Sequence, residues 1–315
     1  HNYLLERIGA LRMPILRRRE LEKRIRSLRY SMPDITIRGW DWDSKPVRSP
    51  INLGLGVSEL SNRYCESMRD IYLRRILKVK PKISPAAYRG ILYHETISRA
   101  ITDSKRFVFE KDMVSGYEIA EELLSKADLV IKEISTEIST NFELGGDYNW
   151  LDEATKLYKY VILQVAASID RVLSKHPWVD LDSLVAMAIP PVTERIVDGS
   201  LVGLSSQLRV DLYSEGNVVT DIKTGEPRPF HRLSPTGYAL ALEADQEIPI
   251  DFGVIAYVRV GKWPTFRYDV FPISDELRLE FLTLRDEAIA IVENAEDPGK
   301  PANCPDSCIF KEVCP

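Results

Sequence analysis

The chain has 315 residues, 44% of them hydrophobic and 28% charged, and its formal net charge is −5. This composition is that of an ordinary globular protein, and the negative total excludes a basic field over the whole molecule, so any nucleic-acid site must be a local positive patch. No run of about 18 apolar residues is present to span a membrane, and the charged first residues hold no signal-peptide core. We expect a cytoplasmic protein without a membrane partner.

The first 180 residues are predicted to be mostly helical. We expect helices over residues 17–30, 58–80, 85–101, 116–138 and 153–176. In the last two of these segments, apolar residues recur at three- and four-residue spacing, which is typical of amphipathic helices. The segment 39–50, GWDWDSKPVRSP, interrupts the series with glycine and proline.

The pattern changes after Pro177. Short segments rich in β-branched and aromatic residues predict strands at 184–197, 204–213, 217–223, 251–260 and 265–273. Helices are expected at 234–244 and at 274–297, the second with Ser274 as its N-cap. This order indicates an α/β fold, a mixed sheet flanked by helices and joined by a helical subdomain. We divide the chain into an N-terminal arm (1–55), a helical region (56–180), a core (181–295) and a cysteine-rich tail (296–315).

A β-hairpin is predicted in LRVDLYSEGNVVTDIKTG, where two strands flank the turn SEGN. Side chains alternate along a strand, so Asp221 and Lys223 share one face, and a hairpin of this length sets Asp211 beside Asp221 within one register step. Two carboxylates and an ammonium group on one surface suit phosphodiester hydrolysis with Mg²⁺ or Mn²⁺. Taken alone, an Asp-x-Lys pattern more often describes solvent-facing acids with a salt-bridged lysine.

Two further residues favour the catalytic interpretation. His94 follows Gly90 by four positions in the predicted helix RGILYHETI, and a neutral imidazole is a competent Mn²⁺ ligand, although a single histidine more often belongs to the core or the surface. Tyr238 lies on the predicted helix SPTGYALALEA, close enough in sequence to the Asp-x-Lys strand to approach the same site.

Three of the four cysteines, Cys304, Cys308 and Cys314, lie near the C-terminus, and the fourth is Cys65. Four cysteines are too sparse for a disulfide scaffold in a chain of this length, and in a reducing compartment clustered cysteines more often bind metal. Four thiolates can hold a [4Fe-4S] or [2Fe-2S] cluster, or a tetrahedral zinc ion.

The order Gly-x-x-x-His, Asp, Asp-x-Lys and a Tyr-bearing helix resembles the RecB-like branch of the PD-(D/E)xK nucleases. One cysteine before the histidine motif and three at the C-terminus are similar to the iron–sulfur members of that branch, in particular to the CRISPR-associated RecB-like exonucleases of the longer archaeal form linked to type I-A systems. The resemblance covers residues 55–315 and rests on SNRYCESMRDIYLRR, RGILYHETI, VGLSSQLRVDLY, VVTDIKTGEPRP and GYALALEA.

This resemblance implies a PD-(D/E)xK, restriction-endonuclease-like fold with a C-terminal iron–sulfur tail. It makes His94, Asp211, Asp221 and the carbonyl of Ile222 ligands of Mn²⁺ or Mg²⁺, Lys223 the catalytic lysine, and Tyr238 the aromatic residue of the fourth motif. The family usually has glutamine four residues before this tyrosine, where this chain has the shorter Ser234. The role of that glutamine is therefore not carried over, and His231 or Arg232 nearby are candidates to replace it.

The resemblance also brings Cys65 to the tail. It implies that Cys65, Cys304, Cys308 and Cys314 hold an iron–sulfur cluster, with [4Fe-4S] favoured, [2Fe-2S] possible and zinc as the alternative. Three residues separate Cys304 from Cys308, whereas two are more common in the family. We expect a structural cluster that clips the C-terminus to the front of the chain and closes a very long loop.

A local positive patch follows Cys65 in MRDIYLRRILKVKPK. We expect it to contact phosphates and stack a base through Arg69, Tyr72, Arg74, Arg75 and Lys78. The other interpretation is an ordinary solvated helix face.

The resulting hypothesis is a divalent-metal-dependent exonuclease that acts on single-stranded DNA. The resemblance implies 5′ to 3′ polarity, a role in CRISPR adaptation through spacer acquisition and prespacer end processing, and the integrase proteins of that pathway as partners. The alternative is a catalytically inactive DNA-binding or scaffolding subunit with a nuclease-like fold, which the serine at position 234 favours.

Overall fold

The computed structural model describes residues 18–80, 84–111, 114–139, 150–190, 192–214, 218–302, 304, 308–311 and 313–314. A five-stranded mixed sheet lies at its centre, with the strands in the order β1-β2-β3-β4-β5. The strands are β1 (Val192–Val197), β2 (Leu208–Ser214), β3 (Val218–Lys223), β4 (Phe252–Val260) and β5 (Pro264–Pro272). Neighbouring strands are antiparallel except β3 and β4, which are parallel. The expected mixed α/β class is confirmed.

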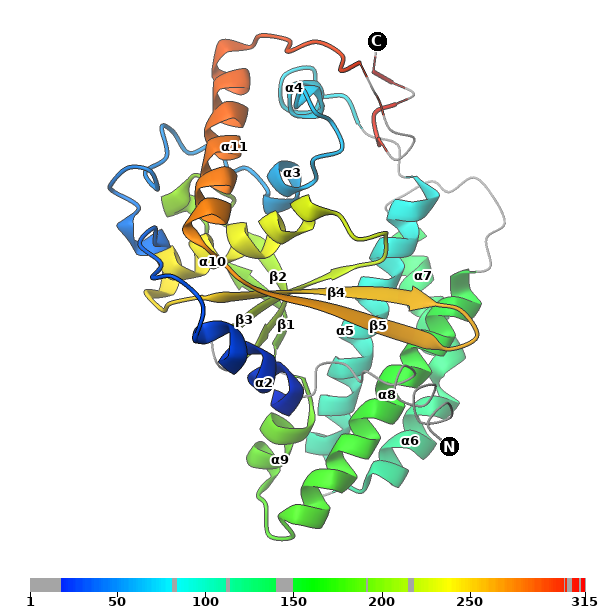
Figure 1. The fold of residues 1–315 in the computed structure, drawn as a ribbon. Coiled ribbons are helices and arrows are strands. Elements are labelled where there is room, and N and C mark those ends of the chain that lie inside the picture. The colour runs from blue at the N-terminus through cyan, green and yellow to red at the C-terminus, as the bar shows by residue number, and fades with distance from the viewer. Residues whose placement is uncertain are drawn as a thin grey trace, which may run out of the picture.

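One face of the sheet is covered by helices that follow the strands in sequence. The crossover helix α10 (Leu233–Gln246) joins β3 to β4, because parallel strands cannot be connected by a tight turn. It lies over the sheet beside α11 (Asp275–Asn294) and near α3 (Val57–Ser61) (Figure 1). The strands contribute Val210, Val219, Ile255 and Phe271 to the core on this side, where they meet residues of α10 and α11.

The other face is covered by helices that precede β1 in the sequence (Figure 1). These are α5 (Pro85–Lys111), α6 (Gly116–Ser125), α7 (Ala127–Ser139), α8 (Trp150–Lys175) and α9 (Leu181–Ala188). The apolar faces of these helices bury a core that includes Ile222, Ala256, Val258 and Phe266 from the strands. Helix α2 (Arg18–Arg29) confirms the expected basic helix and buries Leu21 against Phe252 and Val254.

Two predicted helices are each interrupted. The helix expected over 58–80 is wrong, because the chain forms α3 and α4 (Arg69–Arg75) with a turn between them that holds Cys65. Met68 ends this turn in the left-handed region at φ 56°, and the C-terminal tail contacts the turn, so tertiary contacts override helix propensity here. The helix expected over 116–138 is divided into α6 and α7 at Lys126.

The strand predicted over 184–197 is wrong in its first half. Residues 181–188 form helix α9, where Leu184 and Ala188 lie one turn apart and are buried. Asp180 is its N-cap, since its carboxylate accepts a 2.9 Å hydrogen bond from the backbone N–H of Ser183. The apolar residues at positions 184–189, LVAMAI, made the segment resemble a strand. Strand β1 begins only at Val192.

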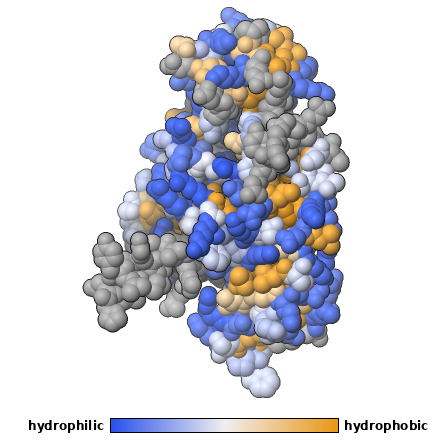
Figure 2. All heavy atoms as spheres, turned by 90° about the vertical axis from the view of Figure 1, so that its right-hand side faces the viewer, coloured by the Kyte–Doolittle hydropathy of each residue, from blue (hydrophilic) through white to orange (hydrophobic). Residues whose placement is uncertain are grey.

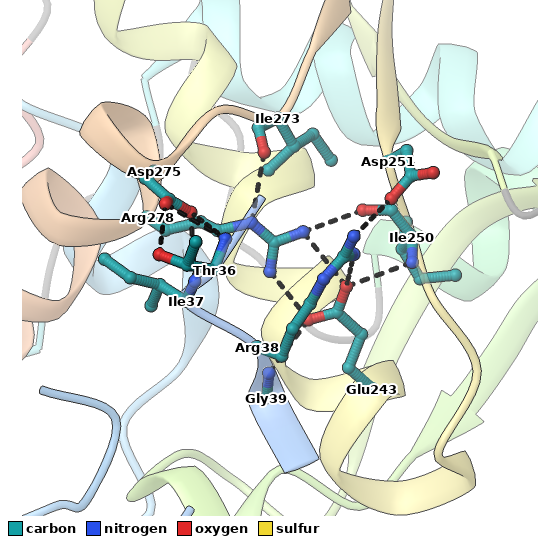
Figure 3. Close-up of polar contacts among 10 residues, drawn as sticks. All are labelled: Thr36, Ile37, Arg38, Gly39, Glu243, Ile250, Asp251, Ile273, Asp275 and Arg278. Atoms are coloured by element: carbon teal, nitrogen blue, oxygen red, sulfur yellow. Dashed lines mark hydrogen bonds and ion pairs between the residues drawn. The ribbon is translucent and has the colours of Figure 1, made fainter. Parts of the chain in front are cut away.

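The segment before α3 joins the core through buried charges. The carboxylate of Glu243, at the end of α10, accepts hydrogen bonds from Arg38, from Arg278 of α11 and from the backbone N–H of Gly39 (Figure 3). The side chains of Glu243 and Arg278 are fully buried, and Arg38 makes a second ion pair with Asp251. A Cβ atom at position 39 would lie 2.0 Å from the carbonyl oxygen of Leu240, so only glycine permits this approach.

The same segment is held at a second point. The backbone N–H groups of Thr36 and Ile37 donate to the carboxylate of Asp275, in the first turn of α11 (Figure 3). Residues 47–60 then contribute Val47, Leu55, Val57 and Leu60 to the core that also contains residues of β2 to β5. The chain from Thr36 onward therefore packs as part of the core that carries the sheet.

The described helices and one face of the surface bear on whether the chain could span a membrane. None of the described helices combines the length and the apolar character needed to cross a bilayer. On the face of the molecule shown in Figure 2, hydrophobic patches are separated by hydrophilic side chains.

Candidate active site

The site is built around the backbone of Ile222, near the end of β3. The β2–β3 ladder pairs Leu212 with Thr220 and goes no further toward this end, so Ile222 has no backbone partner in β2. The carboxylate of Asp211 accepts a 2.8 Å hydrogen bond from the N–H of Ile222, and Nε2 of His94 lies 2.8 Å from its carbonyl oxygen. Side chains from β2 and α5 therefore replace the missing strand contacts.

His94 also contacts Asp211 directly. Nδ1 of its ring lies 3.4 Å from Oδ1 of Asp211, so the imidazole lies between a carboxylate and a carbonyl oxygen. Helix α5 brings it there, and Gly90, one turn earlier, faces the side chain of Thr224 beyond the end of β3. The spacing Gly-x-x-x-His thus puts the glycine and the histidine on the face of α5 that meets β3.

Asp221 and Lys223 flank Ile222 along β3. Oδ2 of Asp221 and Nζ of Lys223 are 2.9 Å apart, and Oδ1 of Asp221 accepts a 2.8 Å hydrogen bond from the hydroxyl of Ser234. Oδ2 is buried, and the ammonium group of Lys223 is its partner among the described groups. Ser234 comes from the first turn of α10, so the crossover helix helps to build the site.

Opposite charges determine the protonation of His94 and Asp211. Burial disfavours the imidazolium form, but the carboxylates of Asp211 and Asp221 outweigh it and raise the pKa of His94 to about 9. Burial alone would raise the pKa of Asp211, yet His94, the N–H of Ile222 and Lys223 keep it below its usual value. The pair is thus an imidazolium and a carboxylate at neutral pH.

Asp221 and Lys223 influence each other in the same way. Burial raises the pKa of Asp221, and the charge of Asp211 adds to this effect against the opposing influence of Lys223 and Ser234. Burial would lower the pKa of Lys223, but the two aspartates raise it above its ordinary value. Lys223 is therefore an ammonium ion at neutral pH.

The donor set suits a hard divalent cation. Two carboxylates, one imidazole nitrogen and one backbone carbonyl converge here, and oxygen-rich sets with a histidine are typical of Mg²⁺ and Mn²⁺ sites. The buried carboxylate of Asp221 lies near a second carboxylate, that of Asp211, and the negative charge of this pair is what such an ion would stabilise. Within the described residues, no three His, Cys, Asp or Glu side chains are arranged closely enough to hold a metal as they stand. The residues would fit the ion in chemistry if His94 were neutral, because only a deprotonated imidazole nitrogen can bind a metal.

Other predicted residues lie around this centre. Tyr238 is on α10, one turn after Ser234, and packs at the edge of the core on that face. His231 is buried and Nδ1 of its ring lies 3.1 Å from the hydroxyl of Tyr257, which is opposite Lys223 in the β3–β4 register. Burial, Lys223 and Arg228 lower the pKa of His231 to about 4, so its imidazole is neutral at pH 7.

Arg232 and Tyr257 differ from what the sequence indicated. Arg232 forms a bidentate ion pair with Asp269 of β5. Its guanidinium group is therefore paired with a carboxylate outside the cluster around Lys223. Tyr257 was missed by the sequence analysis. The sequence feature that could have identified it is its position on the predicted strand β4. Parallel pairing of β3 and β4 puts this position opposite Lys223.

The C-terminal tail returns to the turn that carries Cys65. The hydroxyl of Ser67 donates to the carbonyl of Gly299, and Arg69 binds Asp297 and lies 3.2 Å from the sulfur of Cys314. Burial raises the pKa of the Cys308 thiol, and two neighbouring cysteines, Cys304 and Cys65, raise it further. These contacts bring the four cysteines into one region at the start of α4.

Most of the arginines expected to bind DNA have internal partners. Arg69 is buried and paired with Asp297, and Arg75 is paired with Glu59. Arg74 lies over the ring of Phe310 and also near Glu59. Tyr72 is half-buried, whereas Lys78 is exposed. The partners of these arginines are acidic and aromatic residues of α3 and of the tail. These partners lie outside the segment in which the patch was predicted, so the sequence of that segment gave no sign of them.

Comparison with known proteins gives the family. A family model described as CRISPR-associated exonuclease Csa1 matches residues 13–315. The chain belongs to the Csa1 family. A Csa1 protein of Saccharolobus solfataricus is 34% identical over 296 residues, 93% of this chain and 96% of the relative. A Csa1 protein of Thermoproteus tenax is 29% identical over 280 residues, 88% and 90% of the two chains. Both relatives carry the name CRISPR-associated exonuclease.

Membership in the Csa1 family confirms the resemblance to CRISPR-associated exonucleases that the motifs indicated. The chain is an enzyme of the nuclease class. The cluster of His94, Asp211, Asp221 and Lys223 lies within the region that the Csa1 model matches.

Proposed function

We propose that the chain is a divalent-metal-dependent exonuclease that degrades single-stranded DNA from the 5′ end during CRISPR adaptation. The observation that carries this proposal is the convergence of His94, Asp211, Asp221 and Lys223 around the backbone of Ile222. Side chains from α5, β2 and β3 meet there, and the family name supplies the reaction class.

The strand topology supports a PD-(D/E)xK core. An antiparallel β1–β2–β3 meander continues through α10 into the parallel strand β4, and the acidic residues and the lysine come from β2 and β3. This is the arrangement that the resemblance to RecB-like nucleases leads one to expect, and it accounts for why residues 10 positions apart meet at one edge of the sheet.

The protein groups have distinct tasks in the reaction. We infer that Asp211, Asp221, Nε2 of His94 and the carbonyl of Ile222 hold Mg²⁺ or Mn²⁺. When bound, such an ion supplies the Lewis acidity that draws charge from the scissile phosphate and acidifies a nearby water. Ser234 fixes Oδ1 of Asp221 and so orients the carboxylate.

Lys223 acts through its charge. Its pKa is raised by Asp221 and Asp211, so it carries a proton at neutral pH and cannot accept one from water. Its ammonium group is instead suited to stabilise the negative charge that develops on the phosphate oxygens, or to orient the attacking water by donation. A neutral analogue of this side chain should therefore be inactive even where the ion still binds.

The proposed substrate and pathway rest on the resemblance to a known family. The preference for single strands, the 5′ to 3′ polarity and the integrase partners come from the resemblance to CRISPR-associated RecB-like exonucleases, and the relatives' names associate them with CRISPR. A reducing cytoplasm is the compartment that free, clustered thiols favour.

We further propose that Cys65, Cys304, Cys308 and Cys314 hold an iron–sulfur cluster, most compatible with [4Fe-4S]. The contacts of Ser67 and Arg69 with the tail support this proposal, since they bring the distant thiols to one side of α4. When bound, the cluster would fasten the C-terminus to the turn before α4. Zinc is the other ion that four thiolates accept.

The decisive experiment is cleavage of end-labelled single-stranded DNA by anaerobically prepared protein with Mn²⁺. Wild type is compared with Lys223→Met, which keeps the length of the side chain and removes its charge. We expect wild type to shorten the DNA from the 5′ end and the variant to lose activity while remaining folded at the assay temperature, as circular dichroism would check. If neither protein cuts and both bind DNA, the chain is a DNA-holding subunit and the proposal fails.

A further inference from the structure

Two aromatic side chains meet beside the active-site lysine. Tyr64 lies in the turn between α3 and α4, and Phe230 lies in the short helix η3 (Pro229–Arg232) that follows β3. Their rings are arranged edge to face, with centroids 5.2 Å apart and an interplanar angle of 82°. Both side chains are half-buried, so part of each ring is accessible.

The pair lies within electrostatic reach of Lys223. Tyr64 adds a small effect that raises the pKa of Lys223, which is consistent with a position near the ammonium group. Phe230 packs edge to face on His231, with ring centroids 5.0 Å apart, and His231 contacts Tyr257 beside Lys223. A continuous row of rings thus runs from Tyr64 to the strand next to the active site.

Core packing does not account for Tyr64. Phe230 packs at the margin of the core that contains α10, whereas Tyr64 belongs to none of the hydrophobic clusters formed by the described residues. The preceding residue, Arg63, has a buried Nη1 that finds no acceptor in the part of the chain that the structure describes. A buried donor without an acceptor calls for an explanation, and an anionic ligand at this turn would supply one.

We propose that Tyr64 and Phe230 form a stacking subsite for one nucleobase of the strand that is cut. The inference rests on the proposed nuclease function and names the substrate group that this part of the site recognises. Every base has a π-face, so aromatic stacking holds a strand without selecting its sequence. The base would be held next to the phosphate that Lys223 serves, and Arg63 would donate to the backbone of the same strand.

The turn that carries Tyr64 is fixed in advance. Cys65 follows it directly, and Ser67 and Arg69 are bound to the tail through Gly299 and Asp297. A ring held in place before the substrate arrives loses little conformational freedom on binding, which favours its use as a stacking platform.

The test combines protein variants with abasic substrates. A set of end-labelled single-stranded oligonucleotides carries one abasic nucleotide at each position flanking the terminal scissile bond, and kcat/KM is measured relative to the intact strand. Wild type should prefer the intact strand by roughly 10- to 100-fold at one position, which is the range expected for stacking of one base. Tyr64→Leu and Phe230→Leu should bring this ratio close to one, mainly through KM, and Tyr64→Phe should keep it.

The outcomes separate this inference from the proposed function. Tyr117→Leu is the matched control, because Tyr117 is an exposed tyrosine on α6, and it should keep the wild-type ratio. If Tyr64→Leu slows intact and abasic strands by the same factor, the ratio is unchanged and the stacking subsite is overturned while the nuclease stands. If wild type shows no preference at any position, the subsite is likewise overturned. Absence of cleavage by wild type on every strand would reject the proposed nuclease function itself.

Discussion

Ser234 donates a 2.8 Å hydrogen bond from its hydroxyl to Oδ1 of Asp221, and both side chains are buried. This serine occupies the position where the RecB-like pattern has glutamine. From the sequence alone, that difference favoured the alternative hypothesis of a catalytically inactive subunit. The first turn of α10 lies so close to β3 that the short side chain reaches the carboxylate directly. The departure from the family pattern therefore contributes a contact to the site.

Ser234→Ala should lower kcat roughly tenfold or more with little change in KM for DNA. Removing a hydrogen bond to a charged group costs about 1.5–3 kcal/mol, and here the loss would free the Asp221 carboxylate to rotate. Steady-state cleavage of labelled single-stranded DNA measures both constants. Ser234→Thr, which keeps the hydroxyl, is the matched control, and an Ala variant with wild-type kcat would show that the hydrogen bond has no role in orienting Asp221.

The stability of the metal-free protein should depend on pH through His94. Its pKa is about 9 in the folded protein and about 6.5 in an unfolded chain, so the folded state binds more protons between these values. The free energy of unfolding should therefore fall as the pH rises from about 6.5 to 9. The contribution of His94 is fully present below this window and lost above it.

Thermal unfolding in EDTA at a series of pH values measures this effect. His94→Gln should flatten the decrease in melting temperature over the window, because glutamine does not titrate. An equal decrease in wild type and in His94→Gln would assign the pH dependence to other groups and contradict the charged state of His94 inferred from its contacts with Asp211.

Glu243→Ala should destabilise the fold by about 3–5 kcal/mol, because it leaves the buried guanidinium of Arg278 without its carboxylate. The N–H of Gly39 and the side chain of Arg38 would lose the same partner. Urea unfolding followed by circular dichroism gives the free energy. Glu226→Ala is the control, because Glu226 forms a largely exposed ion pair with Arg259 and its removal should have little effect. A small loss for Glu243→Ala would mean that water relieves the charge of Arg278.

Arg69→Gln should loosen the C-terminal tail. Arg69 holds Asp297 through three hydrogen bonds and contacts the sulfur of Cys314, so its loss should increase proteolysis after α11 and lower the iron bound per chain. Limited proteolysis and the visible absorbance of anaerobic protein measure the two effects separately. Arg75→Gln breaks an ion pair within the same α3–α4 region without touching the tail and serves as the control. Unchanged proteolysis would show that other contacts hold the tail.

Local patterns predicted much of the framework. The alternation of apolar residues and the turn SEGN indicated β2 and β3, and the same short range brought Asp211 near Asp221 and Lys223. The segment after Asp-x-Lys was expected as a helix and is α10. These features depend on residues a few positions apart, which is the range over which hydrogen-bonding pattern and side-chain direction are determined by the backbone itself.

Other features depend on partners that are distant in sequence. Arg69 and Asp297 are separated by 228 positions, and Arg38 and Glu243 by 205. The break between α3 and α4, the internal pairing of the basic patch and the meeting of Tyr64 with Phe230 all arise from such contacts. The sequence of the basic patch was compatible with a solvated helix. The acidic residues that pair with its arginines lie in other segments of the chain.

The sequence by itself determined which chemistry is present: two acids, a lysine and a histidine at the spacings of a nuclease, and four thiols in two separate segments. Only the tertiary structure decided how these groups are used. Packing of α5 and α10 against the end of β3 made His94 an imidazolium, buried the ion pair of Asp221 and Lys223, and gave Ser234 its contact. Protonation and hydrogen bonding depend on burial and on nearby charge, and both are properties of the folded arrangement of the chain.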